Sequence, residues 1–234
     1  MAGTDAASGG APVVGRRRTI AAFDFDGTVS RKDTLVPFVA KVAGIPRSAV
    51  AASAAVWSGV RGHFDWRDRD EVKAHLIERL LAGRSVRELE RTGGTYAAQL
   101  LDSGLRPEMV EQVRRHVSAG HETIFISASL VYYLEPIARH FDMTAVIAVE
   151  PEEEGGRLTG SMRHPNVRAA QKSLRLRHWL GIGPDAPLEG IELWAYGNTA
   201  GDHQLLEMAD HAFWLGKPAK RPAGVEEFAP GSAF

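Results

Sequence analysis

A short apolar segment that ends in two carboxylates limits the folds open to this chain more than any other feature. Residues 21–25 read Ala-Ala-Phe-Asp-Phe, and Asp26, Gly27 and Thr28 follow directly. Apolar residues on both sides of so short a run are typical of a strand buried on both faces, as in a parallel sheet. A doubly wound α/β sheet binds its ligand at the carboxyl ends of its strands. Two acids at that edge are costly unless a cation, a proton or a substrate uses them, so we expect Asp24 and Asp26 to belong to a functional site.

Strand and helix patterns alternate after this segment. A second strand is predicted over 121–129, with its apolar run at 122–126 and its end at 127–129. Further strands are predicted at 145–149, 191–196 and 212–215. Helices are predicted at 35–42, 107–119, 131–140, 166–180 and 204–209. An acidic stretch with paired glycines, residues 150–160, is expected to be the tip of a hairpin. The alternation predicts an α/β fold with a doubly wound parallel sheet.

Residues 47–106 interrupt this alternation, because they contain no convincing strand. Helices are predicted at 48–60 and 68–82 from their apolar spacing. Ser85 is expected to cap a third helix, in a capping box with Glu88. The block therefore reads as a helical insert between the first strand and the rest of the sheet.

These patterns divide the chain into a core and an insert. We expect an α/β catalytic core at 19–34 and 107–220 and an inserted helical cap at 35–106. Residues 1–18 are expected to be a disordered lead, since the first 15 residues are rich in Gly, Ala, Ser and Pro. Residues 221–234 are expected to be a C-terminal tail.

Composition narrows the class of partner. A formal net charge of −1 gives no overall field toward nucleic acid or a membrane surface. No run of 18 apolar residues predicts a membrane span, and the chain has no cysteine, which fits a reducing cytoplasm. We therefore expect a cytoplasmic protein that acts on a small molecule, with no nucleic-acid and no membrane partner. The sequence does not specify an oligomeric state.

Polar residues at the predicted strand ends form a set suited to phosphoryl transfer through an aspartate. Ser127 lies at the end of the second strand, Asn198 and Asp202 follow the fourth, and Lys172 lies on a predicted helix. A carboxylate nucleophile attacks phosphorus to give an acyl phosphate, which water then hydrolyses. The transition state is anionic and needs charge stabilisation, and Mg²⁺ suits a site made of oxygen ligands.

Four motifs in this order resemble the haloacid dehalogenase superfamily. They are Asp24–Thr28, Ser127, Lys172 and Gly197–Asp202, and the resemblance runs over about residues 19–217. Several details resemble its phosphoserine phosphatase-like branch (subfamily IB), namely the helical cap between the first and second motifs and the segments 127–129, 156–160 and 196–198. The resemblance implies a Rossmann-like core and a Mg²⁺-dependent phosphatase acting on a small phosphorylated metabolite.

The resemblance also implies a role for each matching residue. Asp24 would be the nucleophile and a metal ligand. Asp26 would be the general acid and base, with its backbone carbonyl on the metal, and Thr28 would help to orient it. Asn198 and Asp202 would complete the surroundings of Mg²⁺. The phosphate would be held by Gly27, Thr28, Ser127, Ala128 and Lys172.

Two positions depart from the pattern of that family. Asn198 stands where an aspartate is common, which removes one negative charge and predicts weaker Mg²⁺ binding. Asp33 falls where relatives that accept phosphoserine carry a glutamate, and its side chain is one methylene shorter. Arg168 is an alternative to Lys172 as the basic residue of the third motif.

Three further residues have two interpretations each. Lys73 and Arg79, on the predicted helix 68–82, either close over an anionic substrate tail or are ordinary solvated charges. His203 either faces the cleft or is a bystander beside Asp202.

Rival functions share the same core motifs. A phosphotransferase or mutase would differ only in the group that accepts the phosphoryl group, and a non-catalytic phosphate-binding module would keep the cradle without turnover. A dehalogenase has no use for a second acid at Asp26, which argues against it.

Overall fold

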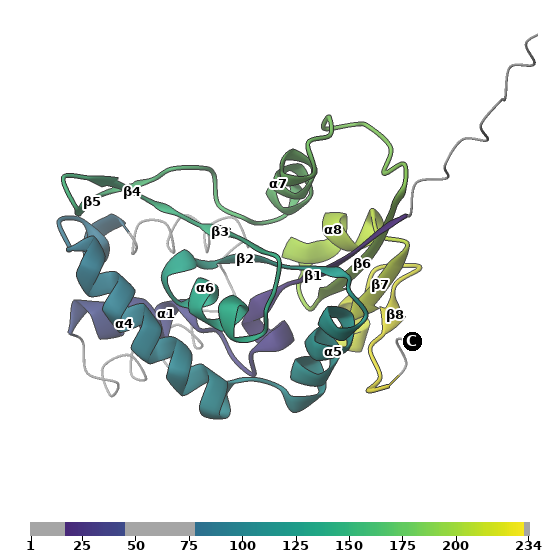
Figure 1. The fold of residues 1–234 in the computed structure, drawn as a ribbon, viewed down its shortest axis with the longest axis horizontal. Helices are drawn as coiled ribbons and strands as arrows, with labels where there is room; N and C mark the ends of the chain where they lie inside the picture. Colours follow the sequence, from purple (N-terminus) through teal and green to yellow (C-terminus); the bar gives the residue numbers. More distant parts are fainter. Residues whose placement is uncertain (1–16, 45–77, 232–234) are drawn as a thin grey trace, which may run out of the picture.

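The computed structural model describes residues 17–44 and 78–231, and a sheet of six strands in the order β3-β2-β1-β6-β7-β8 forms its centre (Figure 1). The strands are β1 (Arg18–Phe23), β2 (Glu122–Leu130), β3 (Ala145–Val149), β6 (Ile191–Gly197), β7 (His211–Trp214) and β8 (Glu226–Glu227). Every neighbouring pair in this sheet is parallel. The predicted α/β fold with a doubly wound parallel sheet is confirmed.

β1 lies in the middle of the sheet, where its apolar residues have neighbours on all sides. The side chains of Ile20, Ala21, Ala22 and Phe23 are 0% exposed. Phe23 pairs with the residue opposite it on each neighbouring strand, and its ring stacks on that of Tyr196 at 4.6 Å between centroids. A strand that is apolar on both faces avoids contact with water only in such a buried, central position.

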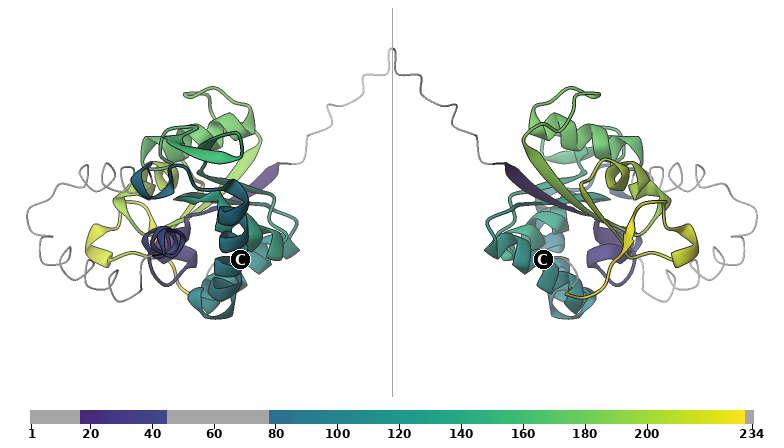
Figure 2. Two further views of the ribbon diagram at one scale, coloured as in Figure 1. Left: turned by 90° about the vertical axis from the view of Figure 1, so that its left-hand side faces the viewer. Right: turned by 90° about the vertical axis from the view of Figure 1, so that its right-hand side faces the viewer.

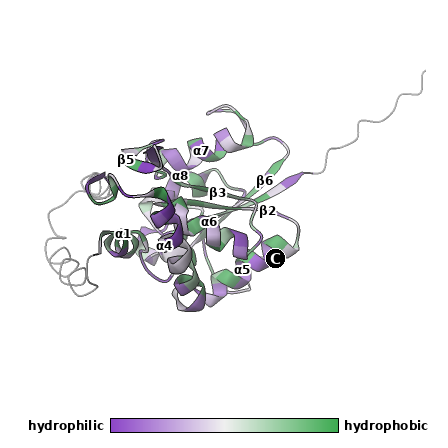
Figure 3. Cartoon of the chain, turned by 60° about the vertical axis from the view of Figure 1, so that its left-hand side comes forward, coloured by the Kyte–Doolittle hydropathy of each residue, from purple (hydrophilic) through white to green (hydrophobic). Residues whose placement is uncertain are grey.

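Helices cover both faces of this sheet. The α-helices of the described residues are α1 (Leu35–Ala43), α4 (Val86–Gln99), α5 (Pro107–Ser118), α6 (Val131–His140), α7 (Ala170–Leu180) and α8 (His203–Glu207). Helices α5 and α6 lie on one face and α7 and α8 on the other, and apolar residues gather on the strands between them (Figures 1, 2 and 3). Among the described residues, no helix combines the length and the apolar character needed to cross a membrane.

The order of the strands explains this arrangement and locates the ligand crevice. The chain runs from β1 outward to β2 and β3, then returns to the other side of β1 with β6, β7 and β8. Right-handed crossovers in opposite directions put their helices on opposite faces. Ligands of such sheets bind where the order reverses, at the carboxyl ends of the strands. Here that position lies between the ends of β1 and β6.

The two ends of the expected helical cap lie side by side. Ser30 and Leu105 form an antiparallel bridge, flanked by hydrogen bonds from the Arg31 N–H to the Gly104 carbonyl (2.9 Å) and from the Arg106 N–H to the Val29 carbonyl (2.9 Å). An insert can leave and rejoin a core at one place only if its two roots are neighbours. This geometry fits the expected insertion between the first two core strands.

Helix α4, the longest described part of the insert, packs against α6 of the core. A Cβ atom at Gly93 would lie 2.2 Å from the backbone oxygen of Tyr132, so only glycine allows this close approach. The segment before α4 pairs with an antiparallel hairpin of β4 (Pro151–Glu154) and β5 (Arg157–Met162). Its hydrogen bonds include Gly83 N–H to the Leu158 carbonyl, 2.8 Å. The predicted hairpin at 150–160 is confirmed.

Several local predictions need correction. α4 begins after Ser85 as predicted, but the Ser85 side chain makes no capping hydrogen bond, so the expected capping box is wrong. The backbone of Ser85 instead bridges to Arg157. α7 begins at Ala170, because Ala169 has a φ of 49° that no helix accepts.

The sheet is also larger than predicted. β2 ends at Leu130, one residue beyond the expected strand 121–129, and has a register shift opposite β3. The two-residue strand β8 lies within 221–234, the expected C-terminal tail, and adds an edge strand beside β7. The predicted helix at 48–60 and most of the predicted helix at 68–82 lie outside the described residues. Within the described end of the second one, residues 78–81 are helical.

Candidate active site

Asp24 lies directly beyond β1, where the backbone turns out of the sheet. Its N–H still donates to the Tyr196 carbonyl of β6 at 2.9 Å, which extends the ladder by one bond. The turn that follows depends on Gly27, which has a φ of 80°. A Cβ atom at Gly27 would also lie 2.2 Å from Nδ2 of Asn198. Glycine therefore brings the ends of β1 and β6 into contact at this point.

Lys172 joins two carboxylates that come from different parts of the chain. Its Nζ donates to Oδ1 of Asp24 and to Oδ1 of Asp202, both at 2.6 Å. These three residues are 2%, 6% and 1% exposed respectively, so the ion pairs are almost sealed from water. Buried charges of this kind persist only when they are paired and hydrogen-bonded.

Asp202 is held by the turn that follows β6. Its Oδ2 accepts from the N–H groups of Asn198 (3.1 Å) and Thr199 (2.9 Å) and from Oγ1 of Thr199 (3.0 Å). Gly197 permits this, since a Cβ there would lie 2.5 Å from the Cβ of Asp202. Both oxygens of Asp202 are thus occupied by protein donors, which suits an anchor for Lys172.

Burial and the charges of neighbouring groups together set the ionisation of these three groups. Burial and the neighbouring charge of Asp202 raise the pKa of Asp24 to about 7, although Lys172 acts in the opposite direction. Burial alone would lower the pKa of Lys172, but the two carboxylates outweigh it and raise that pKa. Burial alone would raise the pKa of Asp202, but Lys172 and the backbone donors lower it. Near neutral pH, Lys172 is charged and Asp202 is ionised.

Asp26 turns away from this charged cluster. Its Oδ1 accepts from the N–H (2.8 Å) and Oγ1 (2.5 Å) of Thr34, and its Oδ2 accepts from Oγ of Ser129 (2.5 Å). Thr28 was expected to orient Asp26, and that expectation is wrong, because its hydroxyl donates to Oδ2 of Asp24 at 2.9 Å. The two carboxylates of the first motif therefore have separate sets of partners.

Ser127 and Ala128 lie near the end of β2, at the same edge of the sheet as Asp24. β2 pairs with β1 as far as Phe23 opposite Phe125, so Ser127 follows two residues beyond the last pair. Ser127 is 1% exposed, and its Oγ accepts from the N–H of Ser129 at 3.2 Å. This position suits a hydroxyl that meets a phosphate bound at Asp24.

Oxygen atoms suitable for Mg²⁺ gather between Asp24 and Asn198. Nδ2 of Asn198 donates to the backbone carbonyl of Asp26 at 3.2 Å. Its Oδ1 is buried and has no hydrogen-bond partner among the described residues. A buried acceptor without a donor is costly, and a cation would satisfy it. Together with the Asp24 carboxylate, these oxygens form a donor set that fits Mg²⁺.

The candidate metal site is poor in charge. Among residues 17–44 and 78–231, no three His, Asp or Glu side chains come together as a metal site. The set therefore relies on two neutral oxygens, the amide of Asn198 and the carbonyl of Asp26, beside the carboxylate of Asp24.

The other predicted residues that the structure describes have contacts of their own. Asp33 is exposed and accepts from the N–H of Val36 (3.3 Å) at the start of α1, and Arg79 is exposed. Arg168 packs against Gly201, where an added Cβ would lie 2.9 Å from its side chain, and Lys172 holds the position between the carboxylates. His203 contacts the ring of Trp214 at 5.6 Å between centroids. Lys73 lies outside the described residues.

Sequence reasoning missed Thr34 and Ser129, which bind the Asp26 carboxylate. Ser129 follows Ser127 by two residues, so β2 places both on one side of the strand. The predicted strand 121–129 contains Ser129, but nothing in the sequence assigns its hydroxyl to Asp26. Thr34 directly precedes a predicted helix, and nothing else in the sequence connects it with Asp26.

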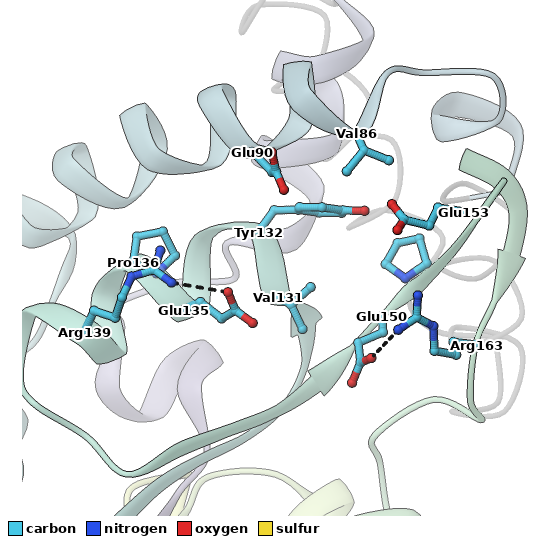
Figure 4. Close-up of a pocket in the computed structure, with 11 residues that line it drawn as sticks. Val86, Glu90, Val131, Tyr132, Glu135, Pro136, Arg139, Glu150, Glu153 and Arg163 are labelled. Carbon is cyan, nitrogen blue, oxygen red and sulfur yellow. Dashed lines mark hydrogen bonds and ion pairs between the residues drawn. The ribbon is translucent and has the colours of Figure 1, made fainter. Parts of the chain in front are cut away.

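A separate hollow of about 380 Å³ lies between α4, α6 and the β4–β5 hairpin (Figure 4). Tyr132 projects into it between Glu90 and Glu153 (Figure 4). Ion pairs join Arg139 to Glu135 (3.4 Å) and Arg163 to Glu150 (3.5 Å) at its margins. None of the predicted site residues lines this hollow.

Comparisons with known proteins identify similar sequences and structures. The family model for haloacid dehalogenase-like hydrolases matches residues 21–207. Protein CicA of Caulobacter vibrioides is 31% identical over 210 residues, which cover 88% of this chain and 91% of that protein. Phosphoserine phosphatase of Archaeoglobus fulgidus is 25% identical over 197 residues, which cover 83% of this chain and 51% of that protein. A solved structure from Bordetella pertussis, described as of unknown function, superposes with a TM-score of 0.70 at 25% identity, over 86% of this chain and 92% of that chain.

Proposed function

This chain belongs to the haloacid dehalogenase-like hydrolases, and from that premise we propose that it is a Mg²⁺-dependent phosphatase that hydrolyses a small phosphomonoester through a phosphorylated Asp24. The observation that carries the proposal is the buried contact of Asp24 with Thr28 and Lys172. A carboxylate at a strand end, with a hydroxyl on one oxygen and an ammonium on the other, is fixed in orientation and next to a positive charge. Both conditions favour attack on an anionic phosphate.

In the first step, a carboxylate oxygen of Asp24 attacks phosphorus in line with the ester bond. The bond from Asp24 to phosphorus forms, the bond from phosphorus to the ester oxygen breaks, and Asp26 gives that oxygen a proton. Lys172 keeps its charge throughout and offsets the negative charge around Asp24. Ser127 and the backbone near Ala128 donate hydrogen bonds to the phosphate oxygens.

In the second step, water attacks phosphorus on the opposite side from Asp24. Asp26, now ionised, takes a proton from that water, and the carboxylate of Asp24 is released with inorganic phosphate. Asp24, the carbonyl of Asp26 and Asn198 would hold the metal. When bound, Mg²⁺ supplies positive charge that neutralises the phosphoryl oxygens in the transition state. Asp202 keeps Lys172 in place.

The proposed substrate is a small phosphorylated metabolite of the phosphoserine type. The similarity to a phosphoserine phosphatase supports this class. Asp33, exposed at the start of α1, is the proposed contact for a positive group on the substrate, with a shorter reach than glutamate. Residues 35–106 are the proposed cap that closes over the substrate, to which Lys73 and Arg79 belong.

Phosphate release tests the proposal. The purified chain with Mg²⁺ is expected to hydrolyse p-nitrophenyl phosphate and at least one member of a panel of phosphorylated amino acids, sugars and alcohols. Asp24→Asn should abolish release from all of them, and a metal chelator should do so reversibly. Asp102→Asn is the matched control, because Asp102 is an exposed carboxylate in the turn Leu100–Gly104. Activity that survives in Asp24→Asn, or a wild type that releases no phosphate from the whole panel, would contradict the proposal.

A further inference from the structure

Tyr133 of α6 is a buried residue that the proposed reaction leaves without a role. We propose that Tyr133 is a positioning residue for the acid and base Asp26, and that it acts through the hydroxyl of Thr34. The inference rests on the proposed function, since it concerns the proton that Asp26 delivers. Three hydrogen bonds, two from Thr34 and one from Ser129, hold the Asp26 carboxylate.

Counting hydrogens fixes the direction of this chain of bonds. An ionised carboxylate only accepts, so the single hydroxyl hydrogen of Thr34 points to Oδ1 of Asp26 at 2.5 Å. The hydroxyl of Tyr133 lies 3.0 Å from Oγ1 of Thr34. While Asp26 is ionised, Thr34 and Ser129 both give their hydroxyl hydrogens to its carboxylate. The Tyr133 hydroxyl, which is hydrogen-bonded to both of them, is then the donor toward these two hydroxyls. One line of hydrogen bonds therefore runs from Tyr133 through Thr34 to Asp26, beside a second contact of the same phenol with Ser129, and each bond polarises the next.

Packing holds Tyr133 and Thr34 in place. Tyr133 is 0% exposed and Thr34 is 3% exposed. The Tyr133 ring lies against those of Phe38 and Tyr96, at 4.9 Å and 5.3 Å between centroids. The hydroxyl of Tyr96 also donates to the Thr34 carbonyl at 3.1 Å. Every polar group of Thr34 is thus engaged, and its hydroxyl has one orientation.

The chemistry of Tyr133 suits a permanent donor. Burial, and then the negative charge of Asp26, raise the pKa of Tyr133 well above its usual range. The phenol therefore stays protonated near neutral pH. Without the Tyr133 hydroxyl, the Thr34 hydroxyl would lose one of the hydrogen bonds that fix its orientation. The Asp26 carboxylate would then be held less firmly.

A leaving-group comparison tests this role with the full chain and Mg²⁺. An alkyl phosphate needs a proton on its departing oxygen, whereas p-nitrophenolate departs without one. Tyr133→Phe is expected to lower kcat/KM by about 10-fold for the fastest alkyl phosphate of the panel, part of the roughly 100-fold or more that general acid catalysis contributes. For p-nitrophenyl phosphate it should change kcat/KM by less than about 2-fold, because the first irreversible step there does not use the proton.

Two further variants sharpen the result. Thr34→Val should reproduce the selective loss, and Thr34→Ser, which keeps the hydroxyl, should restore most of the alkyl phosphate activity. Thr34→Val also serves if Tyr133→Phe does not fold. Tyr132→Phe is the matched control, because that neighbouring hydroxyl lies in the separate hollow (Figure 4) and should leave both substrates unchanged.

The outcomes separate this inference from the proposed function. Equal losses on both substrates, or no loss on either, would overturn the positioning role while leaving the phosphatase intact. A wild type without activity on either substrate would overturn the proposed function and this inference with it. Asp24→Asn should lose both substrates, which identifies the same site as the source of both activities.

Discussion

Lys172 offsets only one of the two carboxylates that it contacts, so single charges matter at this site. Asp24 and Asp202 share its ammonium, and the neutral Asn198 stands beside them. A divalent cation that approaches Asp24 meets one carboxylate, one amide oxygen and one backbone carbonyl. Replacing the amide by a carboxylate would add a full negative charge within ligand distance of the cation.

This charge difference predicts the metal affinity of one variant. Asn198→Asp is expected to lower the Mg²⁺ concentration that gives half-maximal activity, because a carboxylate attracts a hard cation more strongly than an amide. A Mg²⁺ titration of phosphate release measures it. Thr199→Ser is the control, since it keeps the hydroxyl that binds Asp202. Equal or tighter half-saturation in the wild type would contradict the charge argument.

Residues that belong to a local motif could be predicted at this scale, and residues that meet across the fold could not. Asp24 and Asp26 were recognisable because they follow an apolar strand within a few positions. Ser129 is 103 residues from Asp26 in the chain, and no spacing connects them. The partner of Thr28 was predicted wrongly for a related reason, since a turn decides which carboxylate its hydroxyl meets.

At the scale of elements, α4 and α6 pack closely against each other at Gly93. Two adjacent glycines on α4 differ in their surroundings. A Cβ at Gly93 would lie 2.2 Å from the Tyr132 oxygen, whereas a Cβ at Gly94 would have nothing within 4 Å. The same substitution therefore has opposite consequences at neighbouring positions of one helix.

Stability measurements on these two positions test the packing. Gly93→Ala is expected to lower the free energy of unfolding by about 1–3 kcal/mol, because the methyl group forces the helices apart. Gly94→Ala is expected to raise it by up to about 1 kcal/mol, since alanine favours the helix. Urea denaturation of both variants provides the measurement. Equal effects at the two positions would show that α4 does not pack on α6 in this way.

Local sequence signals located most elements but not all their ends. Gly44 ends α1 in a left-handed conformation, as expected of such a glycine. The start of α7 was predicted wrongly because a contact elsewhere decides it. The N–H of Ala169 donates to the Gly201 carbonyl at 2.9 Å, which holds the backbone before α7 out of the helix. β8 has two residues and forms only because β7 offers it an edge.

At the scale of the whole molecule, a buried histidine couples stability to pH. His116 is 0% exposed beneath the sheet, where its Nε2 lies 2.9 Å from the hydroxyl of Tyr196 and its Nδ1 2.8 Å from Nδ1 of His121. Burial, and then the neighbouring His121, lower the pKa of His116 to about 3. In the unfolded chain that pKa returns to about 6.5.

The unfolded chain therefore binds more protons than the folded one between these two values. The stabilising contribution of neutral His116 is complete above about pH 6.5 and is lost as the pH falls toward 3. From pH 7 to pH 5, the wild type should lose about 2 kcal/mol of unfolding free energy more than His116→Gln, at about 1.4 kcal/mol per pH unit below the unfolded pKa. Denaturant unfolding at both pH values gives this difference. His164→Gln, at an exposed position, should keep the wild-type dependence; a His116→Gln variant that does so as well would exclude the linkage.

The arrangement of the whole fold was accessible from the sequence because few topologies satisfy alternating buried strands and helices. The position of the site at the carboxyl ends of β1 and β6 follows from that topology. The sequence could not indicate the separate surroundings of Asp24 and Asp26, which arise from three-dimensional contacts with Lys172 on one side and Thr34 on the other.

The central claim is that Asp24 carries the phosphoryl group. Its most direct test mixes the enzyme rapidly with a substrate labelled with radioactive phosphorus, quenches in acid within the first turnover, and maps the label by peptide mass spectrometry. We expect transient label on the peptide that contains Asp24 and none in Asp24→Asn. Label on another residue, or substrate turnover with no labelled protein at any time under conditions that preserve acyl phosphates, would contradict the account.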